Sequence, residues 1–496
     1  MTAPRRRRAY GDDTPRVPGN SLAVGTMSLV SDLDPARRLR GGASESDVLA
    51  FTHVTVIDAT GRPALPGQTV LVKGDRIAAI EKFGKLKLPR SAKVIDAKGK
   101  YMIPGLWDMH VHAVFAERLD SMFPTFVANG VLGIRDMGTS MPLAEIDRLR
   151  HETANGSRLG PRIVAAGPIL DGRPKPLRPN FLAITTPEEG RDAVRRLKTG
   201  GADLIKVYSE LSRDSFLAIA DEAKKQNIPF AGHVPFSVSA LEASDAGQKS
   251  MEHLWGIYLS CSSREEELRS EMLKGGVNLS GSERIRLEMD EAAASYDEGK
   301  AANVFAHLAK NGTWMVPTFK AVLPDSEIFD LRVTTDPRLK YIPLAIQKRW
   351  TDAASAGAAI KSKSFERKLQ VVGAMHRAGV LFLAGTDTAW IQPYTYAGFS
   401  LHDELALLVK AGLTPMESLR TATINPARFL GMEKDWGTIE EGKVANLVLL
   451  DADPLADIHN TTKILKVFLA GKEFPRPALD QMLKEAEAAA KSAVVN

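Results

Sequence analysis

The sequence is short of cysteine, of long hydrophobic runs and of net charge, and each shortage excludes a class of protein. One cysteine, Cys261, among 496 residues rules out a disulfide within the chain, so the fold must stand by packing alone. No stretch approaches the roughly 20 apolar residues of a transmembrane helix, and we expect no membrane association. The net charge of +5 is small and comes partly from Arg5–Arg8, so it does not predict a nucleic-acid surface.

The remaining composition is that of a globular protein with an unusual start. Hydrophobic residues make up 44% and charged residues 25%, enough for one large domain and a smaller one. Residues 1–45 have no hydrophobic period and are predicted to form a disordered arm. The stretch "NSLAVGTMSLV" is weak as a signal sequence. We therefore expect a cytoplasmic protein, the alternative being export with a degenerate or removed signal.

Both ends of the chain predict short strands with glycine turns. Residues 46–104 contain "QTVLVKGDRIAAIEKFG", which indicates a hairpin, and residues 432–475 show the same style. We expect the two segments to build one small β-sandwich domain together. Residues 476–496 are predicted to form a helical tail.

Between these flanks, residues 105–431 alternate apolar runs with helical patterns. Eight strand candidates can be counted, the first in "GLWDMHVHA" and the last in "GVLFLAGTDT". Repeated β-then-α units with near-continuous apolar strands predict an α/β fold of the (β/α)8 TIM-barrel type. Two long charged segments, 256–312 and 320–364, are expected to be elaborations of the sixth and seventh connections.

Polar residues stand where several of these strands end. His110 and His112 lie two apart on the first strand and so share a face. His233, His253 and Asp387 follow in "AGHV", "MEHLW" and "LAGTDT". Each is unremarkable alone, since a packed histidine or a capping aspartate is common. Together they predict a metal site, because imidazole and carboxylate suit zinc and similar divalent ions.

Lys206 is harder to place, since it interrupts the apolar strand of "GADLIKVYSE". An unpaired ammonium is costly to bury, so the lysine lies either at an exposed edge or in a special environment.

The whole set resembles the amidohydrolase superfamily, in particular its imidazolonepropionase-like and prolidase-like branch. The likeness is carried by "GLWDMHVH", the strand-four lysine, the single histidines after strands five and six, "GTD", and the downstream "LHDELALLVKAGLTPMESLRTATINPARFLG". It covers about residues 48–475. Imidazolonepropionase itself holds one metal and lacks a bridging lysine, so Lys206 favours the binuclear, peptidase-like side.

The resemblance implies a ligand set and a mechanism. His110, His112 and Asp387 would bind one divalent ion, His233 and His253 a second, and carbamylated Lys206 would bridge them. The ions are expected to be Zn²⁺, with a bridging hydroxide as nucleophile. Asp387 would carry the proton to the leaving amine, and Tyr208, on the same strand face as Lys206, would either stabilise the oxyanion or simply pack.

Other residues are candidates for substrate contact. Arg135 would either bind a substrate carboxylate or pair with Asp136 and hold the barrel. His402 would either reach the site or start a helix. The aromatic loop "DTAWIQPYTY" offers Trp390, Tyr394 and Tyr396 as a pocket wall.

The expected function is hydrolysis of an amide bond in a small molecule such as a dipeptide or an N-acyl amino acid. The alternatives are a lactone, carbamate or phosphotriester hydrolase on the same site, and a non-catalytic scaffold that kept the fold. Relatives are commonly homo-oligomers, so we expect one here.

Overall fold

The structure is a computed structural model. It describes residues 48–173, 178–275, 279, 283, 286–323, 335–355 and 365–493. The predicted disordered arm, residues 1–45, lies outside the described residues, as does part of the segment 320–364. No described helix is long and apolar enough to cross a membrane.

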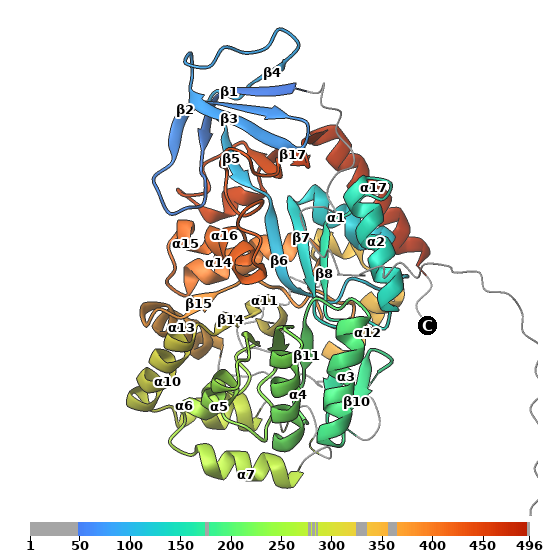
Figure 1. The fold of residues 1–496 in the computed structure, drawn as a ribbon, viewed down its shortest axis with the longest axis vertical. Helices are drawn as coiled ribbons and strands as arrows, with labels where there is room; N and C mark the ends of the chain where they lie inside the picture. Colours follow the sequence, from blue (N-terminus) through green and yellow to red (C-terminus); the bar gives the residue numbers. More distant parts are fainter. Residues whose placement is uncertain are drawn as a thin grey trace, which may run out of the picture. The chain divides into compact units, whose positions relative to one another are not determined.

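Ten short strands form two parallel sheets in the middle of the chain (Figure 1). One sheet contains β6 (Leu106–Val111), β7 (Val131–Asp136) and β8 (Arg162–Ala165). The other contains β9 (Ile169–Asp171), β10 (Phe181–Ala183), β11 (Ile205–Val207), β12 (Phe230–Gly232), β13 (Ser250–Glu252), β14 (Trp314–Val316) and β15 (Leu381–Phe382). Most are buried along their whole length, as parallel strands covered by helices must be.

Hydrogen bonds join the first strand to the chain that follows the last one. The amide of Met109 donates to the carbonyl of Ala384 at 2.9 Å, and the amide of Asp387 donates to the carbonyl of His110 at 2.7 Å. Val111 forms a parallel bridge with Thr388. The parallel, helix-linked strands agree with the α/β prediction, and these bonds bring the end of β6 next to Asp387.

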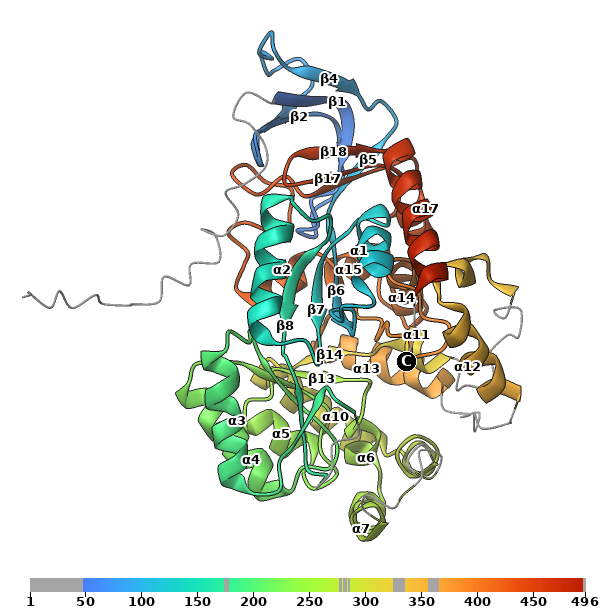
Figure 2. The same cartoon turned by 90° about the vertical axis from the view of Figure 1, so that its right-hand side faces the viewer.

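Helices connect the strands and cover them from outside (Figure 2). They include α1 (Leu119–Ala128), α2 (Leu143–Asn155), α3 (Pro187–Thr199), α4 (Arg213–Lys225), α5 (Ala240–Asp245), α10 (Glu298–Asn311), α13 (Phe365–Arg377), α14 (Phe399–Lys410), α15 (Pro415–Thr421) and α16 (Ile424–Leu430). Local sequence sets several starts. Before α3, the Thr186 side chain accepts from the Glu189 amide while the Glu189 side chain accepts from the Thr186 amide, a capping box.

The two long charged segments hold extra elements, as expected of elaborated connections. Between β13 and β14 lie α6 (Ile257–Cys261), α7 (Glu265–Gly275), the π-helical turn η3 (Arg286–Glu291) and α9 (Ala292–Ala294). Between β14 and β15 lie α11 (Phe319–Val322), η6 (Pro337–Tyr341) and α12 (Leu344–Ser355).

The two chain flanks meet in one sheet of eight strands. Its path is β18-β17-β16-β5-β1-β2-β3, and β4 pairs with β1. The first flank supplies β1 (Val48–Val56), β2 (Leu65–Lys73), β3 (Arg76–Lys82), β4 (Lys93–Asp96) and β5 (Tyr101–Pro104), and the second supplies β16 (Leu447–Leu450), β17 (Ile464–Leu469) and β18 (Lys472–Pro475). The pairing therefore joins strands of both flanks in one sheet, as expected of one shared domain, and does not show the predicted sandwich. Helix α17 (Arg476–Ser492) follows it and packs against α1 (Figure 2).

His402 lies in this scaffold and does not line the cavity described below. It is buried on α14, with its Nε2 3.1 Å from the carbonyl of Asn129 and its Nδ1 2.9 Å from the hydroxyl of Thr461. Thr461 belongs to η7 (Ile458–Thr462), next to the small sheet. Because a carbonyl only accepts, Nε2 carries the proton and Nδ1 accepts from the threonine. Burial lowers the pKa of His402 to about 4, so the ring is neutral.

Replacing His402 with phenylalanine should lower stability and leave kcat/KM almost unchanged. Losing the two buried hydrogen bonds should cost about 1–3 kcal/mol at pH 7.5. The lowered pKa sets the sign: the neutral ring stabilises the fold above its unfolded pKa of about 6.5, and this stability is lost as pH falls toward 4. Urea unfolding should therefore show that the free energy of unfolding of the wild type falls between pH 7.5 and pH 5.0. The same fall should be smaller in the variant. His459→Ala, exposed in η7, is the control; a fall in kcat/KM with unchanged stability would contradict this role.

Candidate metal centre

His110 lies near the end of β6 and His112 directly follows the strand, and both turn the same ring nitrogen into the cavity. The Nδ1–H of His110 donates to Glu252 Oε2 at 2.6 Å, and the Nδ1–H of His112 donates to the carbonyl of Gly138 at 2.9 Å. Each partner fixes the tautomer that leaves an Nε2 lone pair free. The Nε2 of His110 is buried and has no hydrogen-bond partner among the described residues.

His233 and His253, after β12 and β13, are held in the same way. The Nδ1 of His233 lies 2.8 Å from the Ser209 hydroxyl, and the Nδ1 of His253 lies 2.7 Å from the Thr318 hydroxyl. His253 has a left-handed backbone with a φ of 62°. Such strain in a non-glycine residue persists where the surroundings impose it, often at functional sites. All four histidines thus have Nδ1 occupied.

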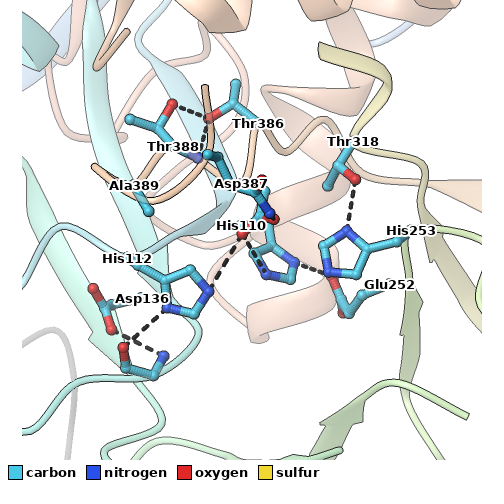
Figure 3. A network of polar contacts seen from close by, with 12 residues as sticks. His110, His112, Asp136, Glu252, His253, Thr318, Thr386, Asp387, Thr388 and Ala389 are labelled. Carbon is cyan, nitrogen blue, oxygen red and sulfur yellow. Dashed lines mark hydrogen bonds and ion pairs between the residues drawn. The ribbon is translucent and has the colours of Figure 1, made fainter. Parts of the chain in front are cut away.

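Asp387 faces these rings from the chain that follows β15 (Figure 3). Its Oδ1 lies 3.5 Å from Nε2 of His110 and 3.3 Å from Nε2 of His112, and its Oδ2 accepts from the Gln392 amide at 2.7 Å. One ligand atom each from His110, His253 and Asp387 lie within 4.8 Å of one another, close enough to hold one metal ion. Burial alone would raise the pKa of Asp387, but the ring of His112 and the other nearby imidazoles hold it well below its usual range.

Lys206 is in the special environment and not at an exposed edge. Its side chain is 1% exposed in the middle of β11, and its Nζ has no hydrogen-bond partner among the described residues. Burial lowers the pKa of Lys206 to about 8, against the opposing pull of Glu252 and Asp387. With a pKa of about 8, about a tenth of the amine is neutral at pH 7, and this neutral form is the nucleophile.

A cavity of about 690 Å³ opens over this set and is lined by His110, His112, Lys206, His233, His253 and Asp387 together. Tyr208 lines it as well: its ring stacks on His233 with centroids 4.0 Å apart, and Phe181 meets it edge-on at 5.1 Å. The structure thus brings together the six residues predicted as ligands, with Tyr208 beside them.

The other predicted substrate residues are not in the cavity lining. Arg135 is fully buried and bonds Met109, Ser250 and Glu252, so its partner is Glu252 and not Asp136. Trp390 and Tyr394 are buried as well: Trp350 donates to the carbonyl of Trp390 at 2.9 Å, and its ring contacts that of Tyr394. The aromatic loop packs against α12, and its part that lines the cavity is Ala389, Ile391 and Gln392.

Sequence reasoning missed the residues that hold the ligands. Glu252 accepts from Arg135 Nη2 at 3.0 Å, from Ser250 and from His110, with all three side chains fully buried. Burial alone would raise the pKa of Glu252, but Arg135 and His110 hold it well below its usual range. Asp108 accepts from the amide and hydroxyl of Thr386, which ties β6 to the chain around Asp387. The available signal was position: Glu252 directly precedes His253, and Asp108 shares the face of His110.

Comparisons with known proteins show which family the chain is similar to. Residues 101–474 match the amidohydrolase family. The chain is 26% identical to the ochratoxinase of Aspergillus niger over 311 residues, 59% of this chain and 50% of that protein, so it spans about half the length of this curated relative. It is 35% identical to the imidazolonepropionase of Thermoplasma volcanium over 101 residues, 19% of this chain and 23% of that one.

The fold is also similar to that of a solved structure. A putative prolidase from Bifidobacterium longum superimposes with a TM-score of 0.62 and 26% identity, covering 89% of this chain and 100% of that one. The superfamily recognised in the sequence is thereby confirmed, and with it the expectation of an enzyme. Because the family match runs from the start of β5 into β18 and so covers well over half of the sequence, the chain belongs to the amidohydrolase family.

Proposed function

We propose that the protein is a metal-dependent hydrolase that cleaves the amide bond of a small substrate such as a dipeptide or an N-acyl amino acid. The observation that carries this proposal is the convergence of four imidazoles, a carboxylate and a buried lysine at one cavity, with every imidazole Nδ1 already occupied. We also propose that the parallel strands close into a (β/α)8 barrel, supported by the bonds from β6 to residues 384–388.

The residues present fit two divalent metal ions. His110, His112 and Asp387 would hold one ion, His233 and His253 the other, and Lys206 would bridge them as a carbamate. The partnerless Nε2 of His110 and Nζ of Lys206 support this fit, because buried polar atoms are rarely left without a partner. Imidazole with carboxylate favours Zn²⁺ among common ions. When bound, the ions would lower the pKa of water and polarise the scissile carbonyl.

Carbamylation would resolve the position of Lys206. The ammonium first loses a proton to solvent. The lone pair of the neutral amine then forms a C–N bond to carbon dioxide while one C=O π bond opens, and a second proton leaves to solvent, so that a buried cation becomes an anion. The negative charges of Glu252 and Asp387 favour the ammonium form of Lys206, whereas burial favours its neutral amine form. The carbamate is formed from that neutral amine.

The chain's own groups supply the remaining steps. Asp387 has Oδ2 held by Gln392 and Oδ1 near the imidazoles, so Oδ1 is the oxygen that would take the proton of the attacking water and pass it to the leaving amine. Tyr208, fixed by stacking on His233, would donate a hydrogen bond to the oxygen that gains charge.

Two alternatives stay distinguishable. A lactone, carbamate or phosphotriester hydrolase would use the same ligands, and a panel of dipeptides, N-acyl amino acids and lactones separates these reactions. A non-catalytic scaffold would turn over none of them; the complete ligand set disfavours it. The cytoplasmic location and the homo-oligomeric state stay predictions, and light scattering tests the second.

Metal content is the first test of the proposal. After loading with zinc and bicarbonate, elemental analysis should find two ions per chain, and removal by a chelator should abolish activity reversibly. A maximum of one ion per chain under these conditions would favour a mononuclear site.

Replacing Lys206 with alanine should remove the shared ligand and reduce kcat by about a hundredfold or more, since disturbing even the outer partners of metal ligands costs 10–100-fold. Acetate or propionate should partly restore activity, because a carboxylate can place two oxygens where the carbamate stood. Lys206→Arg should not be rescued, since a guanidinium stays cationic. Lys206→Ala protein with two ions and near-normal turnover would refute the binuclear proposal.

Replacing Glu252 with glutamine should weaken metal binding through His110. The loss of charge also leaves Arg135 buried without a counter-ion, which should destabilise the fold by about 3–5 kcal/mol. Chelator competition should show a 10–100-fold lower zinc affinity. Glu222→Gln is the matched control. Glu222 is a buried glutamate on α4 that lies beside Arg195 of α3 and does not line the cavity. Equal zinc affinities in the two variants would remove Glu252 from the site.

A further inference from the structure

The cavity over the candidate metal centre carries arginines that metal binding does not use. Arg118, Arg173 and Arg178 line it, against the carboxylates Glu117 and Glu210 outside the ligand set. Arg173 donates to Glu210 at 3.1 Å, so these two charges offset one another. The remaining charges are the guanidiniums of Arg118 and Arg178 and the carboxylate of Glu117.

Arg118 is the better buried of the two, with a side chain that is 12% exposed. Its Nη1 donates to the carbonyl of His112 at 2.6 Å, and its Nε is buried with no hydrogen-bond partner among the described residues. Glu117 approaches no closer than 3.9 Å and is itself 47% exposed. The guanidinium lies 4.0 Å over the ring of Phe115 and 5.3 Å from that of Trp390. It is thus fixed in orientation, while its charge lacks a hydrogen-bonded anion.

Arg178 lines the same cavity from the segment between β9 and β10, and its side chain is exposed. Burial lowers the pKa of Arg118 against the pull of Glu117 and Asp136, and the positive charge of Arg178 lowers it further. Two guanidiniums that repel each other across one cavity are stabilised when an anion enters between them. Guanidinium geometry suits a carboxylate, which can accept two parallel hydrogen bonds.

We propose that Arg118 and Arg178 form a carboxylate subsite and select substrates with a free carboxylate beside the scissile amide. This inference rests on the proposed amide hydrolysis. Because Arg118 bonds the backbone of His112, a predicted ligand, its guanidinium lies one residue from the metal centre. A carboxylate bound there would lie close to the scissile amide, as the α-carboxylate of the leaving amino acid does, and we assign it to that group.

The rest of the cavity indicates what the other side of the substrate looks like. Glu210 is paired with Arg173, and Glu117 lies 3.9 Å from Arg118, so each of these carboxylates already faces a guanidinium and is a poor site for a free α-ammonium. Apolar side chains dominate the remaining lining, namely Phe115, Ile169, Phe181, Phe236, Trp255 and Val322. The favoured class is an N-acyl amino acid with an apolar acyl group, and a dipeptide with a free amino group should be a poorer substrate.

The test compares an acid with its amide. N-Benzoylphenylalanine and its carboxamide differ only in the charge of the leaving amino acid. With metal-loaded enzyme, kcat/KM for the acid should exceed that for the carboxamide by roughly tenfold or more, the scale of a charged hydrogen bond. Arg178→Gln and Arg118→Gln should lower this ratio toward one, mainly through KM for the acid. Arg148→Gln, an exposed arginine on α2 outside the cavity, is the control and should keep the ratio.

The outcomes separate the subsite from the reaction. Acid and carboxamide cleaved equally well, with ratios unchanged in both variants, would overturn the subsite and leave amide hydrolysis standing. If neither compound is cleaved, calorimetry with N-benzylphenylalanine, which has no scissile carbonyl, decides. If N-benzylphenylalanine binds more tightly than its carboxamide, and if Arg178→Gln weakens its binding, the subsite is supported although the proposed reaction fails. Equal binding of acid and carboxamide overturns the subsite. Arg178→Gln carries the test even if Arg118→Gln does not fold.

Discussion

A buried ion pair between Arg135 and Glu252 is the interaction on which the candidate metal centre depends. Arg135 comes from β7 and Glu252 from β13, and the pair also takes in Met109 on β6 and Ser250 on β13. Burying two charges is costly unless each is fully hydrogen-bonded. Here both carboxylate oxygens of Glu252 have partners, so the cost is offset and three strands are held in one relative position. His110 receives its orientation from the same carboxylate.

The rest of the centre repeats this arrangement with weaker partners. Gly138 holds His112 through a backbone carbonyl, and hydroxyls hold His233 and His253. The strength of the hydrogen-bond partner follows the burial of the ring: His110, which is fully buried, has a carboxylate partner, and His112, whose side chain is 15% exposed, has a carbonyl. A rigid carboxylate is used where water cannot help to orient the ring.

The sequence predicts the convergence of the six candidate ligands because their positions follow from local rules. Alternation places His110 and His112 on one face, and the carboxyl ends of parallel strands meet at one edge, so Lys206, His233, His253 and Asp387 had to converge. Their partners do not follow from such rules. Arg135 and Glu252 are 117 positions apart, so pairing Arg135 with its neighbour Asp136 was reasonable from the chain alone. Trp390 and Tyr394 show why the composition of a loop does not reveal where its side chains point. The ring of Tyr394 contacts Trp350 of α12, and the backbone carbonyl of Trp390 accepts from the same indole, and only the fold determines where that helix lies.

The same reasoning explains why a lysine occupies the middle of β11. A fully buried ammonium would need several hydrogen-bond acceptors, yet the Nζ of Lys206 has none among the described residues, although Glu252 and Asp387 are near enough to influence its charge. Evolution could have removed that cost with leucine or methionine, since replacing a buried charge by an apolar side chain of similar volume is often neutral or stabilising. The partnerless Nε2 of His110 lies at the same cavity and carries the same kind of cost. The burial of these two atoms, Nζ of Lys206 and Nε2 of His110, is costly in the chain alone. It becomes favourable once metal ions and carbon dioxide supply their partners. The energetic deficit of the site as the chain alone builds it is thus itself the strongest physical reason to expect ions bridged by Lys206.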